Sequence, residues 1–98
     1  DVFSFTVEPF MLEQNGVLAN GVLTEILTRI TQQLMVNSGR SLIIDQLMIY
    51  FFQAVQIDDL LHIQPRIIRQ TRRTAIIDFE MYLEAMLVAK ATITVKIN

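Results

Sequence analysis

One segment of this chain repeats its apolar residues with the period of a helix, while the rest repeats them with the period of strands. From residue 18 to residue 34 the apolar stripe returns at every fourth position, as Leu18, Val22, Ile26, Ile30 and Leu34. This spacing predicts a single amphipathic helix of about five turns, and Gly39 is available to end it in a left-handed conformation. One amphipathic helix among several strands can bury its apolar face only against a sheet.

The rest of the chain has strand patterns. Residues 2–8 alternate apolar and polar side chains, and Pro9 ends the pattern because proline cannot donate to a sheet ladder. The strands expected after the helix are 41–54, 60–70, 74–82 and 87–97. Because the first of these is apolar on both faces, we expect it to be covered on both sides. Pro65 predicts a bulge or an unpaired position in its strand.

The predicted element order is β-α-β-β-β-β. Short connections make the last three strands antiparallel, and the small inward residues Ala89 and Ala91 let a helix approach the sheet closely. We interpret residues 1–98 as one α+β domain. Because the chain begins with Asp1 rather than Met, we expect it to be excised from a longer multidomain protein.

Composition narrows the class of protein. Hydrophobic residues make up 52% and charged residues 18%, which excludes a disordered chain. A net charge of -2 argues against direct nucleic-acid contact. The longest apolar run, Leu47 to Phe52, is far shorter than the roughly 20 residues that span a bilayer. We therefore expect a cytoplasmic domain without membrane contact. The high mean hydropathy of +0.42 predicts a homodimer or a higher homo-oligomer that buries further apolar surface.

Four segments, in the expected order, resemble the acyl-CoA thioesterases of the hotdog fold. Gly16 and Gly21 are similar to the glycine pair that opens their central helix. Residues 49–59 resemble the aliphatic and aromatic strand of these enzymes and the turn that follows it. Residues 71–75 resemble their Gly-Arg-Arg turn, and residues 87–92 resemble their last strand. The resemblance implies a five-stranded curved antiparallel sheet wrapped around one long helix. Within the fold, the chain is similar to the C-terminal domain of bacterial regulators that carry CBS and DRTGG domains.

The chain departs from the catalytic pattern of these enzymes. They carry Asn-x-x-Gly-x-x-His-Gly-Gly before the helix and an acidic residue within it. Aligned on the glycine pair, this chain has Glu13 for the Asn, Ala19 for the His, Asn20 for the next Gly and Thr28 for the acid. A threonine hydroxyl without a partner His is neither a base nor an activated nucleophile. We therefore favour a domain that does not hydrolyse thioesters, and assign no catalytic residue beyond the fallback described next.

Glu25 is the fallback for catalysis, because it is the only acid on the expected helix. It lies three residues from Thr28, on a nearby helix face. In the alternative, which we prefer, Glu25 is a solvated or interface residue near the helix start, where its negative charge interacts favourably with the helix dipole.

Ligand binding needs fewer specific side chains than catalysis does. The resemblance implies a coenzyme A thioester as the ligand and no resident cofactor. Gly16 and Gly21 let the backbone approach a ligand, and Asn15 and Asn20 can donate and accept hydrogen bonds. Turn formation and helix capping are the alternative roles of these residues. Thr28, on the expected helix, is also included among these expected ligand-binding residues.

Two further pairs complete the expected ligand site. The resemblance implies that Arg72 and Arg73 hold the phosphates of coenzyme A, with a solvated turn as the alternative. Tyr50 and Phe51 are expected to line an acyl channel, with core or dimer packing as the alternative. No metal site is expected, because the spacing of the Asp residues matches no calcium loop.

Three functions are consistent with this sequence. The first is a non-catalytic domain of a regulatory protein that dimerises and binds an acyl-CoA. The second is an active acyl-CoA thioesterase that uses Glu25 or Asn20. The third is a dimerisation module without a ligand.

Overall fold

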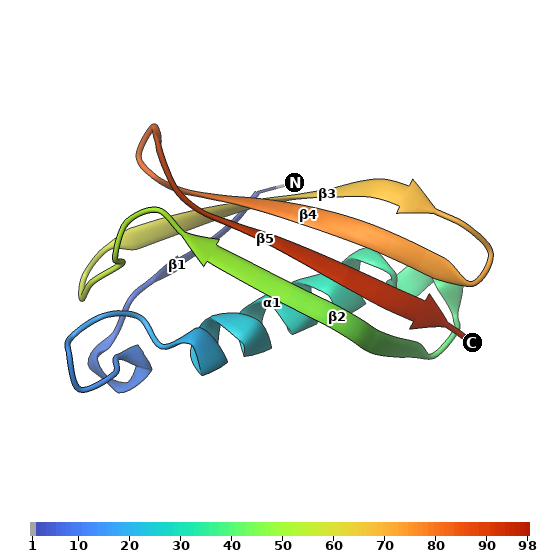
Figure 1. Cartoon of the computed structure of the whole chain (residues 1–98), viewed down its shortest axis with the longest axis horizontal. Helices are drawn as coiled ribbons and strands as arrows, with labels where there is room; N and C mark the ends of the chain where they lie inside the picture. The colour runs from blue at the N-terminus through green and yellow to red at the C-terminus, as the bar shows by residue number, and fades with distance from the viewer. Residues whose placement is uncertain (1) are drawn as a thin grey trace.

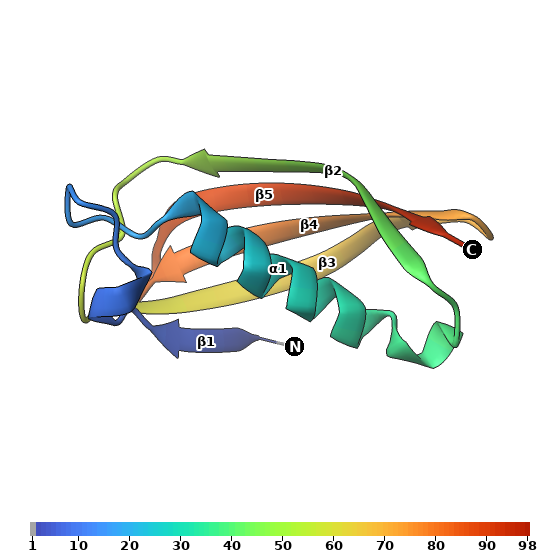
Figure 2. The ribbon, with the colours of Figure 1, turned by 90° about the horizontal axis from the view of Figure 1, so that it is seen from below.

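A single helix lies against the concave face of a five-stranded antiparallel sheet (Figures 1 and 2). The structure is a computed structural model that describes residues 2–98. Its main elements are β1 Phe3–Thr6, α1 Asn20–Leu34, β2 Leu42–Phe51, β3 Leu60–Gln70, β4 Thr74–Leu83 and β5 Met86–Ile97. Two short 3-10 turns, Pro9–Met11 and Val36–Ser38, flank the helix.

The sheet has the strand order β1-β3-β4-β5-β2, and every neighbouring pair is antiparallel. This arrangement confirms the expected element order and the hotdog fold. The first strand covers only part of its neighbour, because β1 pairs with Leu60–Ile63 and no further. Pro65 stays in register with Phe79 of β4 and lies beyond the part of β3 that β1 covers, and the register shift of this strand comes further along, between Ile67 and Arg69.

The helix is about a turn shorter than the apolar stripe predicted, with 15 residues or about four turns. The chain before it is held in an extended form by backbone hydrogen bonds. Leu18 N–H donates to the Val55 carbonyl at 2.7 Å, and Ala19 N–H donates to the Met11 carbonyl at 2.9 Å. Leu18 is therefore buried as part of this extended segment and not as the first turn of the helix. After α1, Gly39 adopts the expected left-handed conformation with a φ of 65°.

The core forms between the buried face of α1 and the inner face of the sheet. Leu23, Leu27 and Ile30 supply the helix side of this contact. The inner sheet residues opposite them are buried, including Ala75, Ile77, Phe79, Met81, Ala89, Ala91, Ile93 and Val95. The burial of Ala89, Ala91, Ile93 and Val95 confirms the predicted inward face of the last strand.

The expectation that both faces of β2 are covered was wrong for the single chain. The inward side chains are half-buried, but the outward side chains Ile43, Met48 and Tyr50 are 52%, 69% and 62% exposed, and Phe52, just after the strand, is 55% exposed. The physical reason is that no second layer lies on the outer face of the sheet, and that β2 is an edge strand. Within residues 2–98, no helix has both the length and the apolar character needed to cross a membrane.

Candidate functional site

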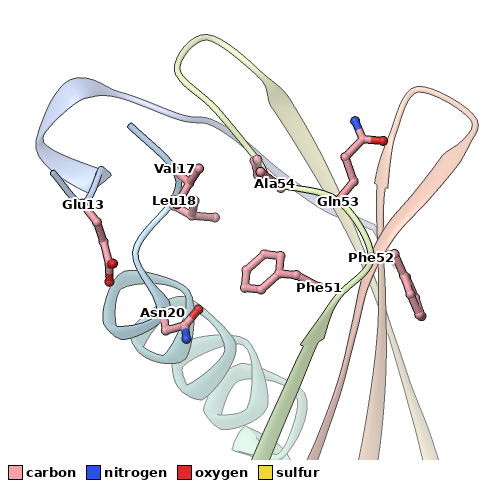
Figure 3. Close-up of a pocket in the computed structure, with 9 residues that line it drawn as sticks. Glu13, Val17, Leu18, Asn20, Phe51, Phe52, Gln53 and Ala54 are labelled. Atoms are coloured by element: carbon pink, nitrogen blue, oxygen red, sulfur yellow. The ribbon is translucent and has the colours of Figure 1, made fainter. Parts of the chain in front are cut away.

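A cavity of about 350 Å³ lies at the N-terminal end of α1. It is bounded by the loop before α1, the first helical residue and the chain that leaves β2 (Figure 3). Its apolar lining includes Val17, Leu18, Phe51, Ala54 and Val55. Leu18 and Val55 are 3% and 0% exposed, so this part of the lining belongs to the core.

Long-range backbone pairing creates the cavity. Besides the hydrogen bond from Leu18 to Val55, an antiparallel bridge joins Val17 to Gln56. These contacts fasten the loop before α1 to the segment after β2. Figure 3 shows the Phe51 ring directed into the space between Leu18 and Asn20.

A tight turn sets the position of Glu13 on the rim. Glu13 N–H donates to the Val17 carbonyl, and Gly16 N–H donates to the Glu13 carbonyl, each at 2.9 Å. Gly16 has a φ of +81°, a conformation that side chains with a Cβ rarely adopt. The Asn15 side-chain oxygen accepts a hydrogen bond from Val17 N–H at 3.3 Å. Asn15 and Gly16 therefore shape the turn that carries Glu13.

The helix start presents free donors beside this rim. Ala19 occupies the N-cap position and makes no side-chain capping bond. The N–H groups of Asn20, Gly21 and Val22 have no acceptor within the helix, because the first turn of any helix leaves such groups unpaired. They also carry the positive end of the helix dipole. A carbonyl or carboxylate oxygen placed here would meet several donors.

The cavity therefore combines an apolar lining with a polar rim. The rim side chains are those of Glu13, Asn20 and Gln53, and Glu13 is the only charged residue that lines the cavity in the described part of the chain. Such a site can hold an apolar group inside while a carbonyl accepts hydrogen bonds from the helix start. A carboxylate at the rim can orient a water molecule or accept its proton. Within residues 2–98, no group of three or more His, Asp or Glu side chains is arranged to hold a metal ion.

The structure brings part of the predicted ligand site together. Asn20 and Phe51 line the cavity directly. Asn15 and Gly16 lie in the adjoining turn and Gly21 is the second residue of α1, but none of the three is part of the lining. The turn role of Asn15, given above as the alternative to ligand binding, is observed.

Five other predicted residues lie outside the cavity of the single chain. Thr28 is half-buried further along α1 and is not part of the lining. Tyr50 is on the exposed outer face of β2, with its ring centroid 5.2 Å from that of Phe52. Arg72 and Arg73 occupy the turn between β3 and β4, at the opposite end of the domain from the start of α1 (Figures 1 and 2). Glu25 accepts a hydrogen bond from Arg29 Nε at 2.8 Å on the exposed side of the helix.

Sequence reasoning missed Glu13 and Gln53 as site residues. Glu13 was considered only as a departure from an expected Asn, although it stands three residues before a turn glycine. That spacing was the one available signal. No sequence signal pointed to Gln53, because it reaches the cavity only through the pairing of its segment with the loop before α1.

Comparison with known proteins gives this site a context. The structure is similar to that of the hypothetical thioesterase protein from Streptococcus pneumoniae TIGR4, crystallised with coenzyme A. The TM-score is 0.89 at 26% identity, covering 99% of this chain and 77% of that chain. The smu.793 protein of Streptococcus mutans UA159, crystallised with acetyl-CoA, has a TM-score of 0.89 at 21% identity, covering 99% and 79% of the two chains. The second likeness shows the fold alone.

A curated relative is much longer than this chain. The uncharacterized protein YtoI of Bacillus subtilis is 29% identical over 97 residues, which cover 98% of this chain and 22% of YtoI. The chain therefore spans about a fifth of the length of this relative.

The family is shown by a match to the model of the Thioesterase superfamily over residues 15–90. This range begins in the turn beside the cavity and runs through α1 into β5, so it includes the helix and most of the sheet. Because the match covers well over half of the chain, and the hotdog architecture agrees with it, the chain belongs to the thioesterase superfamily.

Proposed function

We propose that this domain binds a coenzyme A thioester in the cavity at the start of α1. The observation that carries the proposal is the apolar lining, including Leu18 and Val55, next to a helix start without a side-chain cap. The acyl group occupies the apolar space, and the thioester oxygen accepts from the free helix N–H groups. The coenzyme A complex of the similar pneumococcal protein supports this class of ligand.

The binding unit that we propose is a homodimer joined along β2. This strand has ten residues and lies at one edge of the sheet, so its outer row of backbone groups has no partner strand within residues 2–98. A two-fold axis through the middle of such a contact makes the two β2 strands antiparallel. Pairing would also bring together the exposed apolar side chains of β2.

The charges at the two ends of the domain support this orientation. The connecting segments at the cavity end, 7–19, 52–59 and 84–85, contain five acidic residues and no Lys or Arg: Glu8, Glu13, Asp58, Asp59 and Glu84. The segments at the other end, 35–41 and 71–73, contain Arg40, Arg72 and Arg73 and no acid. An antiparallel pair places the acidic end of one copy beside the basic end of the other. Opposite charges then attract, and the arginines of one copy approach the cavity of the other.

This arrangement gives the predicted roles of Arg72 and Arg73 a geometric basis. In a single chain these residues lie in the β3–β4 turn, at the end of the sheet opposite the cavity (Figure 1). In the antiparallel dimer, the arginines of the second copy are available to the phosphates of a coenzyme A that extends out of the cavity. Asn20 and Phe51 would act on the acyl end of the same ligand.

We propose that binding without hydrolysis is the function of the domain. Ala19 and Thr28 supply neither the imidazole nor the carboxylate of the catalytic pattern, and Glu25 is paired with Arg29 outside the cavity. Binding would act as a signal within a longer regulatory protein of the CBS and DRTGG type. The much greater length of YtoI supports a multidomain context.

One observation favours a second function, hydrolysis of the thioester. Glu13, and not Glu25, is the carboxylate that lines the cavity. Glu13 would accept a proton from a water that attacks the thioester carbonyl, while the helix N–H groups stabilise the oxyanion. The carbon–sulfur bond then breaks, and the coenzyme A thiolate leaves and takes up a proton.

Thermal stability and thiol release, measured on one acyl-CoA panel, separate the functions. A ligand at 100 times its Kd stabilises the folded state by about 2.7 kcal/mol, which raises the Tm of a domain of this size by roughly 10 °C or more. A rise in Tm without release of free coenzyme A thiol supports binding alone. Release that Glu13→Ala abolishes supports the enzyme. If no acyl-CoA changes the Tm, the domain is a dimerisation module without this ligand.

A further inference from the structure

We infer that Arg40 is a positioning residue for the phosphates of the ligand, because it fixes the backbone from which Arg72 and Arg73 extend. The inference rests on the proposed binding of a coenzyme A thioester, in which these two arginines meet the phosphates. It goes further by adding a third arginine, whose role is to hold the turn rather than to contact the ligand.

The Arg40 side chain joins segments that are far apart in the chain. Its Nη1 donates to the Arg72 carbonyl in the β3–β4 turn at 2.7 Å, and its Nε donates to the Asn98 carbonyl after β5 at 2.8 Å. A longer hydrogen bond, of 3.5 Å, runs from its Nη2 to the Ile97 carbonyl. A guanidinium carries its N–H donors in a rigid planar fork, so it can hold several carbonyls in one arrangement, which the ammonium group of lysine cannot do.

The backbone that carries Arg40 is itself held in place. Arg40 N–H donates to Ser38 Oγ at 3.2 Å, and Gly39 before it has a φ of 65°, which turns the chain from α1 into β2. Beside Arg40, the Ser41 carbonyl accepts a hydrogen bond from Asn98 N–H at 3.0 Å, which ties the end of β5 to the same place. The guanidinium therefore extends from a fixed segment.

The β3–β4 turn depends on Arg40 at one of its two central residues. Arg73 has other partners, since its N–H donates to Thr71 Oγ1 at 3.3 Å. The Arg73 carbonyl accepts from Ile97 N–H at 2.8 Å. In the part of the chain that the structure describes, Arg40 is the donor that the Arg72 carbonyl meets. Loss of the Arg40 guanidinium would therefore release Arg72 first.

The proposed dimer brings this end of the domain to the second cavity. Because the two β2 strands are antiparallel about a two-fold axis, the start of β2 in one copy lies beside the end of β2 in the other. Phe51, the last residue of β2, lines the cavity, and Arg40 precedes the first residue of β2 by two positions. Arg40 thus anchors the turn to the segment next to the second copy's cavity. A turn already held in one conformation loses less conformational entropy when it binds a phosphate.

Titration calorimetry with acetyl-CoA tests the inference on the whole domain. Arg40→Gln removes the hydrogen bonds to the turn, and we expect the Kd to rise about fivefold. Arg40→Lys keeps the charge but not the planar fork, and we expect a rise of about threefold. The matched control is Lys96→Gln, which makes the same change of net charge near the same end of the domain. Lys96 Nζ lies 3.6 Å from Asp45, and this change should alter the Kd less than about twofold.

A combination with the turn arginines separates positioning from an independent effect. Added to Arg72→Gln with Arg73→Gln, Arg40→Gln should raise the Kd less than about twofold further, because the side chains that it positions are already gone. A variant that merely weakened the fold would lose affinity in both backgrounds. Arg40→Lys keeps the test valid if Arg40→Gln does not fold.

The possible failures are distinguishable. A wild-type Kd in Arg40→Lys would assign the effect to charge alone, and an undiminished loss in the combined variant would show that Arg40 acts without the turn. Either result would overturn the inference and leave the proposed function standing. If the wild-type domain does not bind acetyl-CoA, or if the Arg72 and Arg73 changes leave the Kd unaltered, the proposal on which the inference rests is wrong.

Discussion

The two edges of the sheet differ in how well they could accept another strand. The β2 edge is ten residues long, contains no proline, and has large apolar side chains on its outer face. Its one acid, Asp45, lies 3.6 Å from Lys96 Nζ of β5, which offsets its charge. At the other edge, β1 covers the first part of β3, and the uncovered part contains Pro65, Arg66 and Arg69 with a register shift.

The β3 edge also exposes Ile67 and Ile68, but its proline, its register shift and its arginines are known obstacles to strand addition. Proline lacks the N–H that a ladder needs, a bulge breaks the register, and charged side chains resist burial. Of these three obstacles, the β2 edge has only the register shift, which lies between Ile44 and Gln46. The comparison supports the proposal that two copies would associate through β2 rather than through the β3 edge.

The largest effect should come from placing charge on the favourable edge. Met48→Lys combined with Tyr50→Lys puts four added cations near the two-fold axis of the proposed dimer. We expect the dimer Kd to rise at least 100-fold, measured by analytical ultracentrifugation. The matched control Ile68→Lys, which places a cation on the β3 edge, should leave the dimer intact. A dimer that survives the double variant, or that Ile68→Lys dissociates, would contradict the assignment of the edges.

A smaller effect should come from the arginines of the β3–β4 turn. Arg72→Gln with Arg73→Gln should weaken the binding of a coenzyme A thioester about tenfold, because two phosphate contacts lose their charge. The matched pair Arg66→Gln with Arg69→Gln makes the same change of net charge on the β3 edge, and should alter the affinity less than about twofold. Isothermal titration calorimetry measures both. Equal losses would mean that net charge, and not the position of the turn, determines affinity.

Removing the obstacles on the β3 edge should have a modest effect that appears only at high concentration. Pro65→Thr with Arg66→Thr restores an N–H group and strand-forming side chains. We expect the free energy of unfolding to change by less than about 1 kcal/mol, while light scattering detects species larger than the dimer. If the variant remains a dimer at every concentration, these residues are not what protects the edge.

The smallest effect should come from a change that touches neither edge. Glu25→Gln breaks an exposed ion pair with Arg29, which should lower the free energy of unfolding by about 0.3–0.5 kcal/mol in a denaturant titration. Thiol release and acyl-CoA affinity should not change. A loss of turnover in Glu25→Gln would restore Glu25 as the catalytic candidate in place of Glu13.

The order of the elements followed from local patterns. The four-residue spacing of Val22, Ile26 and Ile30 requires a helix, and strict alternation requires strands, because each periodicity places the apolar side chains on one face. Short turns then leave antiparallel pairing as the only arrangement for β3, β4 and β5. These features depend on neighbouring residues alone, and the structure confirms them.

The start of the helix and the composition of the cavity depended on tertiary structure. Leu18 continues the helical spacing, but its N–H bonds to Val55, so the helix begins at Asn20. The same pairing brings Gln53 and Ala54 opposite Glu13, which no local pattern could indicate. Asn20 and Phe51 were predicted to belong to the site, and the structure places both in the cavity lining, whereas Glu13 was missed.

The amino-acid sequence by itself therefore determined one helix, five strands and an excess of apolar surface. Only the tertiary structure decided where that excess lies. Apolar side chains on both faces of β2 predict burial on both sides, and the sequence does not distinguish burial by the core from burial by a second chain. The physical reason is that local periodicity records which side chains avoid water, whereas the partner that excludes the water is supplied by residues distant in the chain or by another copy.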